Sequence, residues 1–394
     1  MTNPLFAPVR GFRFGGVHAG IKAQGLDLGA IVGDVIYGAA GVFTQNLVCA
    51  APVTLAKGAV SAGQLRATLV NSGNANAATG EVGLADAKST LEAFAAAYGD
   101  ELIAADVAPC STGVIGVRLP VETMNAAMPT LAKDLNAEGA KRFAEAILTT
   151  DRGIKAARRN FVHEGQERSV LAIAKGAGMI HPNMATTLAF VVSDSPCQTV
   201  EHSFQQALRE ATDRTFNRIT VDGDTSTNDT ILAMSSAGGA APTAFFAALR
   251  DVLGEVAEMI VADGEGAEHV AEVIVSGAQS ETDALTVART VATSNLVKTA
   301  MFGKDPNWGR IAGAAGRAGV AFDPNALTVA VNDVLLFADG VSRVTLAVEE
   351  AAAKVMALPK YEIRVSIGEG DASASYLTCD LGHGYVSVNA DYRS

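Results

Sequence analysis

The chain has 394 residues, of which 49% are hydrophobic and 18% charged, and this predicts a globular protein with about two or three core units. Its net charge of −12 at pH 7 argues against a surface that binds nucleic acid or an anionic membrane. No run of about 18 apolar residues lacks charged or turn residues, and the N-terminal stretch lacks the apolar core of a signal peptide. We therefore expect no membrane span and no secretory leader.

The first half of the chain alternates between the two periodicities of regular structure. Residues 66–80 predict a strand that runs into a Gly/Asn turn, and residues 81–99 have helical spacing with Gly99 as the C-cap. Further helices are expected at 121–134 and 139–149, and further strands at 168–176 and 186–194.

The second half of the chain also alternates between helical and strand periodicity. Helices are expected at 200–215, 243–265 and 282–303, a strand at 269–278, and mostly alternating strand from 361 to 394. Residues 326–340 predict a hairpin whose turn lies near Asn332 and Asp333. Strands and helices mix without a strict βαβ rhythm, so the predicted fold is a layered α/β structure, with mixed sheets sandwiched between helices.

The four cysteines are far apart in the sequence and form no CxxC pair. We expect them to be buried free thiols, as in a protein of the reducing cytoplasm. They are Cys49, Cys110, Cys197 and Cys379.

Several familiar site patterns fail in this sequence. The histidines form no HxH or HExxH pair, and no GxSxG elbow is present. The acidic stretch 222–229 has Thr227 where a calcium loop needs Gly and is followed by Ala233 where the loop needs Glu, so a hydrogen-bonded turn is the better interpretation. The glycine-rich stretch 309–319 lacks the GK[ST] of a phosphate loop. We predict neither a metal ion nor a bound cofactor.

Two hydroxyl residues, Thr186 and Thr187, stand where a glycine-rich loop becomes a strand in "KGAGMIHPNMATTLAF" (175–190). A β-branched residue that simply begins a strand is one explanation. Alternatively, cleavage of the bond between Ala185 and Thr186 would give Thr186 a free α-amine with a pKa near ~8, which suits a general base for its own hydroxyl. The same hydroxyl could make the cut if the loop held it against the Ala185 carbonyl.

This segment closely resembles the self-cleavage segment of the ornithine acetyltransferase family. Further stretches resemble the same family in matching order: "FTQNLVCAAPV", "NSGNANAATG", "CSTGVIGVRLP", "FNRITVDGDTSTNDT", "DGEGAEH", "FGKDPNWGRIAGAAGRAG" and the tail "NADYRS". The resemblance implies a fold related to the β-peptidyl aminopeptidases. It also implies a chain processed into α (1–185) and β (186–394) pieces that assemble as an α2β2 heterotetramer in the cytoplasm.

The resemblance further implies that Thr186 takes the acetyl group of N2-acetylornithine and passes it to glutamate, and some family members also accept acetyl-CoA as the donor. The family motifs place the oxyanion hole on Thr112 and Gly113. Substrate-binding positions fall on Thr150 (with Thr149 as the alternative), Lys175, Glu265, Asn389 and Ser394. Without the resemblance, these residues would pass as an ordinary turn, solvated charges and a frayed chain end.

Three positions depart from the family pattern. Thr187 replaces a more usual apolar residue and makes a cut between Thr186 and Thr187 conceivable. His181 stands where a smaller residue is often found, and Ser394 replaces the usual Thr but keeps the hydroxyl. Three alternative functions stay open: a hydrolase of the same fold, an amino-acid-binding protein with an intact chain, and an acetyltransferase of secondary metabolism.

Overall fold

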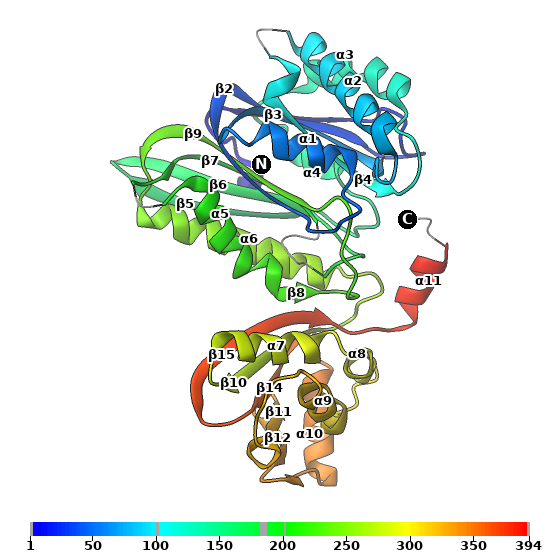
Figure 1. The fold of residues 1–394 in the computed structure, drawn as a ribbon, viewed down its shortest axis with the longest axis vertical. Coiled ribbons are helices and arrows are strands. Elements are labelled where there is room, and N and C mark those ends of the chain that lie inside the picture. Colours follow the sequence, from blue (N-terminus) through cyan, green and yellow to red (C-terminus); the bar gives the residue numbers. More distant parts are fainter. Residues whose placement is uncertain (1–2, 100–101, 182–186, 201, 392–394) are drawn as a thin grey trace.

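The computed structural model describes residues 3–99, 102–181, 187–200 and 202–391, and Figure 1 shows two sheets with helices packed against them. Within these ranges the larger sheet has eight strands in the order β4-β3-β2-β9-β7-β6-β5, with β1 paired to β2. Its strands are β1 (Phe12–Val17), β2 (Leu28–Phe43), β3 (Gln64–Asn74), β4 (Val107–Val114), β5 (Lys155–His163), β6 (Gln166–Lys175), β7 (Leu188–Gln198) and β9 (Thr230–Ala240). The β3–β4 and β7–β9 pairs are parallel and the others antiparallel, so the sheet is mixed.

The apolar sequence of β6 explains its place between two helical layers. Val170 and Ala172 face one core, while Leu171 and Ile173 face the other. A strand buried on both faces has a continuous apolar run rather than a strict alternation. One core is completed by α5 (Phe204–Asp213) and α6 (Thr243–Ala262). On the opposite face lie α1 (Ala51–Ala59), α2 (Gly80–Tyr98), α3 (Val121–Asp134) and α4 (Ala140–Ala146).

The smaller sheet has seven strands within the described residues, in the order β13-β12-β11-β14-β10-β15-β8. These are β8 (Ile219–Thr220), β10 (Val270–Gly277), β11 (Thr328–Val331), β12 (Val334–Ala338), β13 (Val341–Ser342), β14 (Lys360–Ser366) and β15 (Gly370–Cys379). Its core lies against α7 (Glu281–Ala292), α8 (Asn295–Phe302), α9 (Trp308–Gly316) and α10 (Leu346–Met356). Helix α6 packs on the large sheet and also contacts β8 and β15, so it lies between the sheets (Figure 1). Short 3₁₀ helices occur at Pro4–Phe6, Ala104–Asp106, Phe216–Arg218 and Pro324–Ala326.

The expected α/β class, with mixed sheets and helices packed against them, is confirmed. The helix that begins near residue 81 ends at Gly99, which has φ +72°, and the hairpin turns at Asn332, which has φ +47°. The four cysteines are free, and all except the half-buried Cys49 are buried. In the described part of the chain, no helix has the length and apolar character needed to cross a membrane.

Two sequence predictions were wrong. The single helix expected at 282–303 is two helices, because the chain leaves the helix at Thr293, whose hydroxyl bonds back to the Arg289 carbonyl, and restarts after Ser294. The tail expected as strand contains helix α11 (His383–Asp391). No residue of α11 is buried, so its sequence carries no helical apolar stripe to predict it.

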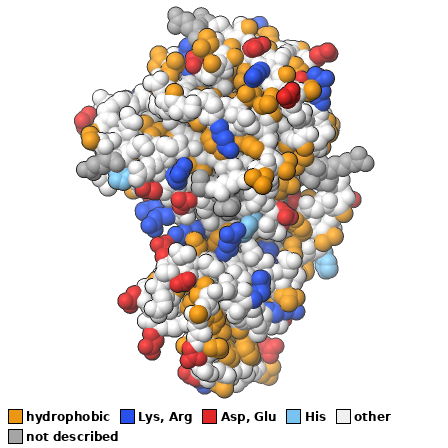
Figure 2. Space-filling view, in the orientation of Figure 1, with side chains coloured by type: hydrophobic (Ala, Val, Ile, Leu, Met, Phe, Trp, Pro, Cys, Tyr) orange, Lys and Arg blue, Asp and Glu red, His pale blue; other side chains and the backbone are white. Residues whose placement is uncertain are grey.

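The larger sheet contains strands from both of the proposed α and β pieces. Strands β1 to β6 belong to residues 1–185, whereas β7 and β9 belong to 186–394, and β9 pairs with β2 on one side and β7 on the other. On the face shown in Figure 2, acidic and basic side chains are interspersed.

Candidate active site

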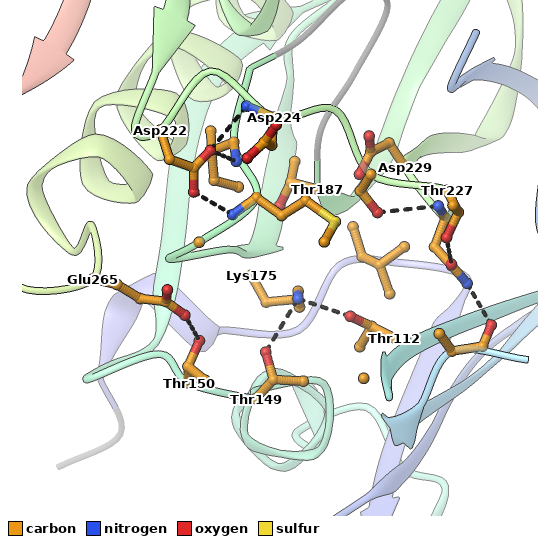
Figure 3. Close-up of a pocket in the computed structure, with 18 of the residues that line it drawn as sticks. Thr112, Thr149, Thr150, Lys175, Thr187, Asp222, Asp224, Thr227, Asp229 and Glu265 are labelled. Carbon is orange, nitrogen blue, oxygen red and sulfur yellow. Dashed lines mark hydrogen bonds between the residues drawn. The ribbon is translucent and has the colours of Figure 1, made fainter. Parts of the chain in front are cut away.

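A polar cavity of about 240 Å³ lies where β4 and β6 of the large sheet end, next to the 222–229 loop and helix α11. Its walls include the predicted residues Thr112, Gly113, Thr149, Thr150, Lys175, Glu265 and Asn389. Figure 3 shows the labelled residues arranged around a common space. Residues far apart in the sequence are therefore neighbours in one site of a size that suits a small ligand.

The two residues predicted for the oxyanion hole lie at the end of β4. Gly113 has φ +132°, and a Cβ on it would lie only 2.3 Å from the backbone carbon of Gly73, so this close approach of β3 and β4 requires glycine. The neighbouring Thr112 is buried, and its hydroxyl oxygen accepts a 2.8 Å hydrogen bond from Lys175 Nζ. Because that oxygen is used as an acceptor, the Thr112 hydroxyl proton is available to a ligand.

Lys175, the last residue of β6, forms the cationic end of the pocket. Besides Thr112, its ammonium contacts the hydroxyl of Thr149 at 3.2 Å (Figure 3). Burial lowers the pKa of Lys175 and nearby Lys155 adds to this, while the Asp151 carboxylate opposes the shift. Lys175 is therefore a half-buried, hydrogen-bonded group and not the freely solvated strand-end charge that its sequence position alone suggests.

Glu265 forms the acidic end. Its carboxylate accepts hydrogen bonds from the Thr150 hydroxyl at 2.7 Å and from Asn389 Nδ2 of α11 at 2.8 Å. A Cβ on Gly178 would lie 2.2 Å from Glu265 Oε2, so glycine at this position makes room for the carboxylate. The two adjacent threonines thus separate, with Thr149 facing Lys175 and Thr150 facing Glu265.

A buried ion cluster behind the pocket escaped the sequence analysis. Lys155 Nζ lies 2.5 Å from a carboxylate oxygen of both Asp151 and Asp263, and the Asp151 side chain is fully buried. Burial alone would raise the pKa of Asp151, but Lys175, Lys155 and several hydrogen bonds outweigh it and lower the pKa to about 2. Asp151 also accepts the backbone N–H groups of Thr149 and Gly176. The cluster therefore ties the loop carrying Thr149 and Thr150 to the turn carrying Glu265.

Three acids of the 222–229 loop, Asp222, Asp224 and Asp229, also line the pocket and were not predicted as site residues. Burial raises the pKa of Asp222, although the backbone N–H groups of Met179 and Ile180 bond to its carboxylate and oppose the shift. Burial raises the pKa of Asp229 well above its ordinary value of 3.8. Among the described residues, neither Asp229 Oδ2 nor the Thr187 hydroxyl has a hydrogen-bond partner. The only sequence signals for these acids were the density of acidic and hydroxyl residues, which resembles an ordinary polar turn, and their place in the family-like stretch "FNRITVDGDTSTNDT", which assigned them no role.

The remaining predicted residues, Ala185, Thr186 and Ser394, lie outside the described residues. Thr187 is described; it is buried and lines the pocket. His181 is also buried, with its ring between Thr220 and Arg289.

Fold and pocket together define a layered α/β protein whose small polar cavity has a cationic end and an acidic end. The chain belongs to the ArgJ family, which it matches over residues 13–394. This confirms the family predicted from the motifs.

Two curated relatives are both named "Arginine biosynthesis bifunctional protein ArgJ". The protein of Methylococcus capsulatus is 45% identical, and that of Chlorobaculum tepidum 44% identical; each comparison covers 100% of this chain and 98% of the relative. Among solved structures, the arginine biosynthesis bifunctional protein of Bacillus halodurans is 41% identical with a TM-score of 0.42, covering 45% of this chain and 92% of that one. The ornithine acetyltransferase of Mycobacterium tuberculosis, complexed with ornithine, is 41% identical with a TM-score of 0.40, covering 46% and 95%.

Proposed function

We propose that this protein transfers the acetyl group of N2-acetylornithine to glutamate, giving ornithine and N-acetylglutamate for arginine biosynthesis, and that acetyl-CoA is its second acetyl donor. The observation that carries the proposal is that Thr112, Lys175, Thr150, Glu265 and Asn389 line one cavity although 277 positions separate the first from the last. Full-length similarity to relatives named as bifunctional proteins of arginine biosynthesis supports it.

The charges of the pocket suit the proposed donor. Lys175 can hold the α-carboxylate that acetylornithine and glutamate share, because a half-buried ammonium forms strong hydrogen bonds with a carboxylate. Glu265 can pair with the δ-ammonium of ornithine at the opposite end. This arrangement leaves the acetylated α-nitrogen beside Thr112 and Gly113.

Chemistry begins at Thr186, which we propose to be the N-terminal residue of the β piece (186–394). Its hydroxyl attacks the acetyl carbonyl carbon while its α-amine takes the proton. The oxyanion receives hydrogen bonds from the Thr112 hydroxyl and the Gly113 backbone N–H, each worth about 3 kcal/mol in comparable sites. The C–N bond then breaks, the proton passes to the departing ornithine amine, and an acetyl ester of Thr186 is left.

The second half-reaction reverses these steps with glutamate. Its amine attacks the acetyl ester, the same donors stabilise the oxyanion, and the Thr186 hydroxyl is regenerated as the C–O bond breaks. Glutamate must be held in line with the ester to compete with water.

Withdrawal of glutamate separates a transferase from a hydrolase of the same fold. With acetylornithine alone, a transferase releases one equivalent of ornithine per site and stalls, whereas a hydrolase continues and accumulates acetate. Continued turnover without glutamate would overturn the proposal. Assaying glutamate acetylation with acetyl-CoA as the sole donor tests the second activity. Failure to acetylate glutamate with either donor would favour the alternative of a transferase that acts on another acceptor amine.

We propose that the nucleophile is created by self-cleavage. The Thr186 hydroxyl attacks the Ala185 carbonyl carbon, the peptide nitrogen leaves as the new α-amine, and water opens the resulting ester to free the Ala185 carboxylate. Intact-mass spectrometry should find pieces of 185 and 209 residues, and Thr186→Ala should stay whole. A full-length band from active enzyme, or a second piece that begins at Thr187, would contradict this site. The pieces should remain together as a cytoplasmic α2β2 assembly, which light scattering of the purified enzyme can test.

A further inference from the structure

The 220–225 segment holds the backbone just upstream of the proposed cut. Asp222 accepts the N–H of Met179 at 2.6 Å through one carboxylate oxygen and the N–H of Ile180 at 2.9 Å through the other. Met179 has φ +56°, a left-handed conformation that costs a residue with a side chain about 1 kcal/mol or more. The two bonds to Asp222 therefore hold a conformation that the chain would not favour by itself.

The carbonyl groups of the same stretch are bound by the same segment. Ile180 O accepts the backbone N–H of Val221 at 2.7 Å and the hydroxyl of Thr220 at 3.1 Å. His181 O accepts the hydroxyl of Thr225 at 2.8 Å. Four backbone groups of residues 179–181 are thus bound by this segment: the N–H groups of Met179 and Ile180 and the carbonyls of Ile180 and His181.

The side chain of His181 adds a further attachment. Arg289 of α7 donates from Nε to His181 Nε2 at 3.1 Å, so the ring proton lies on Nδ1, which is 3.2 Å from the Thr220 hydroxyl oxygen. Burial, and then the Arg289 charge, lower the pKa of His181 to about 4. The ring is therefore neutral at ordinary pH and can accept the Arg289 bond.

The downstream side is attached to the continuation of the same segment. Thr187 O accepts the backbone N–H of Thr230 at 2.9 Å, and Leu188 then pairs with Thr230 as β7 joins β9. The residues that border the 182–186 stretch, His181 and Thr187, are thus bound at Thr225 and Thr230. These two anchors are five positions apart, and five residues of chain span at most about 18 Å.

We propose that Asp222 and Thr225 are positioning residues for self-cleavage: by binding residues 179–181 they fix the upstream border of the scissile stretch, against the downstream border fixed at Thr230. The inference rests on the proposed self-cleavage. Restricting both ends of a short segment raises the effective concentration of a hydroxyl near the carbonyl that it attacks. Every contact named here is made to residues 179–181, 187 or 188, so cleavage at 185–186 breaks none of them.

The test compares cleavage rates of freshly made chain. Wild type and variants are synthesised in a cell-free system with a short radioactive pulse, and full-length and cleaved bands are followed on denaturing gels. Asp222→Asn keeps the size of the side chain but replaces one acceptor oxygen by an NH2 group, and Thr225→Val removes only the hydroxyl. We expect the cleavage half-time to lengthen at least tenfold for Asp222→Asn and several-fold for Thr225→Val.

Two matched variants serve as controls. Thr225→Ser keeps the hydroxyl, and Asp371→Asn removes a charge from an exposed residue of β15 that does not line the pocket. Both should cleave within about twofold of wild type. Circular dichroism of each purified chain checks folding; if Asp222→Asn fails to fold, the Thr225→Val and Thr225→Ser pair decides.

The outcomes separate the two proposals. If wild type never cleaves at 185–186, the proposed self-cleavage fails and this inference fails with it. If wild type cleaves but folded Asp222→Asn and Thr225→Val cleave at the wild-type rate, only the positioning role is overturned. Slower cleavage, or a cut displaced to another bond, in these two variants alone supports it.

Discussion

The two ends of the pocket are built on different parts of the fold. The cationic end consists of Lys175 and Thr112, which lie in β6 and β4 of the large sheet and bond directly to each other. The acidic end consists of Glu265, in the turn after α6, and its partner Asn389, in a helix with no buried residue. Strands in a packed sheet hold atoms more rigidly than a turn and a surface helix do. We infer that Thr112 at the cationic end serves the reaction, which needs fixed geometry, while Glu265 at the acidic end serves binding.

The largest effect is expected from a substitution at the cationic end. Thr112→Val removes the hydroxyl proposed to stabilise the oxyanion, so kcat should fall about 100-fold or more while the KM for acetylornithine changes little. Rates should be measured per cleaved chain, because the same hydroxyl can assist processing. Thr112→Ser, which keeps the hydroxyl, should retain activity within a few-fold of wild type. Equal damage from Ser and Val would show that the hydroxyl is not the cause.

Breaking the acidic end should affect a different kinetic constant. Glu265→Gln removes the charge that would pair with the δ-ammonium, so we expect the KM for acetylornithine to rise about 30-fold, equivalent to about 2 kcal/mol, with a much smaller change in kcat. The KM for glutamate, which lacks that ammonium, should change less. Glu349→Gln on the exposed face of α10 is the control. A fall in kcat alone would contradict the assignment of this end to binding.

Two buried groups near the site should also respond differently to acid. The pKa of His181, whose ring lies between Thr220 and Arg289, is lowered from 6.5 to about 4, and that of Asp151, behind Lys175, from 3.8 to about 2. At any pH between the lowered pKa of the folded state and the ordinary pKa of the unfolded state, each of these two groups binds more protons in the unfolded chain. The stability contributed at His181 is therefore complete above pH 6.5 and lost as the pH falls towards 4, whereas that at Asp151 is lost only between 3.8 and 2.

Urea unfolding of the uncleaved Thr186→Ala chain tests this difference. Between pH 7.5 and pH 5, the unfolding free energy should fall by about 1 kcal/mol through His181, after allowance for solvent screening. In a His181→Gln background, where the ring cannot take up a proton, this part of the fall should disappear. An unchanged pH dependence in that variant would assign the effect to other groups.

The smallest effect is expected at Asn389. Its hydrogen bond to Glu265 is exposed, so Asn389→Ala should raise the KM for acetylornithine only about two- to fivefold. Combined with Glu265→Gln, it should add little more, because both changes act on one interaction. Full additivity in this double-mutant cycle would mean that Asn389 acts independently of Glu265.

Much of the fold could be predicted where one segment carries a strong local pattern. Helix α3 spans residues 121–134 as expected, and β6 lies within one or two residues of its predicted bounds. Prediction failed where the local pattern was ambiguous: Thr293 interrupts an otherwise continuous helical spacing, and the β-branched residues near Val386 favour strand although the chain forms α11 there. The site residues came from motifs, which identify a side chain but not its partner.

The sequence by itself determined the family, the α/β class and seven of the residues that line the pocket, because these depend on local order along the chain. The sequence also has glycine at position 113, but only the structure shows that the close approach of the Gly73 backbone leaves no room for a Cβ there. Tertiary structure alone decided that Lys155 joins Asp151 to Asp263 and that Asp222 binds Met179. Met179 and Asp222 are 43 positions apart, and Lys155 and Asp263 are 108 positions apart. Such partners meet only after the sheets and helices have packed, and no periodicity in the sequence encodes their contact.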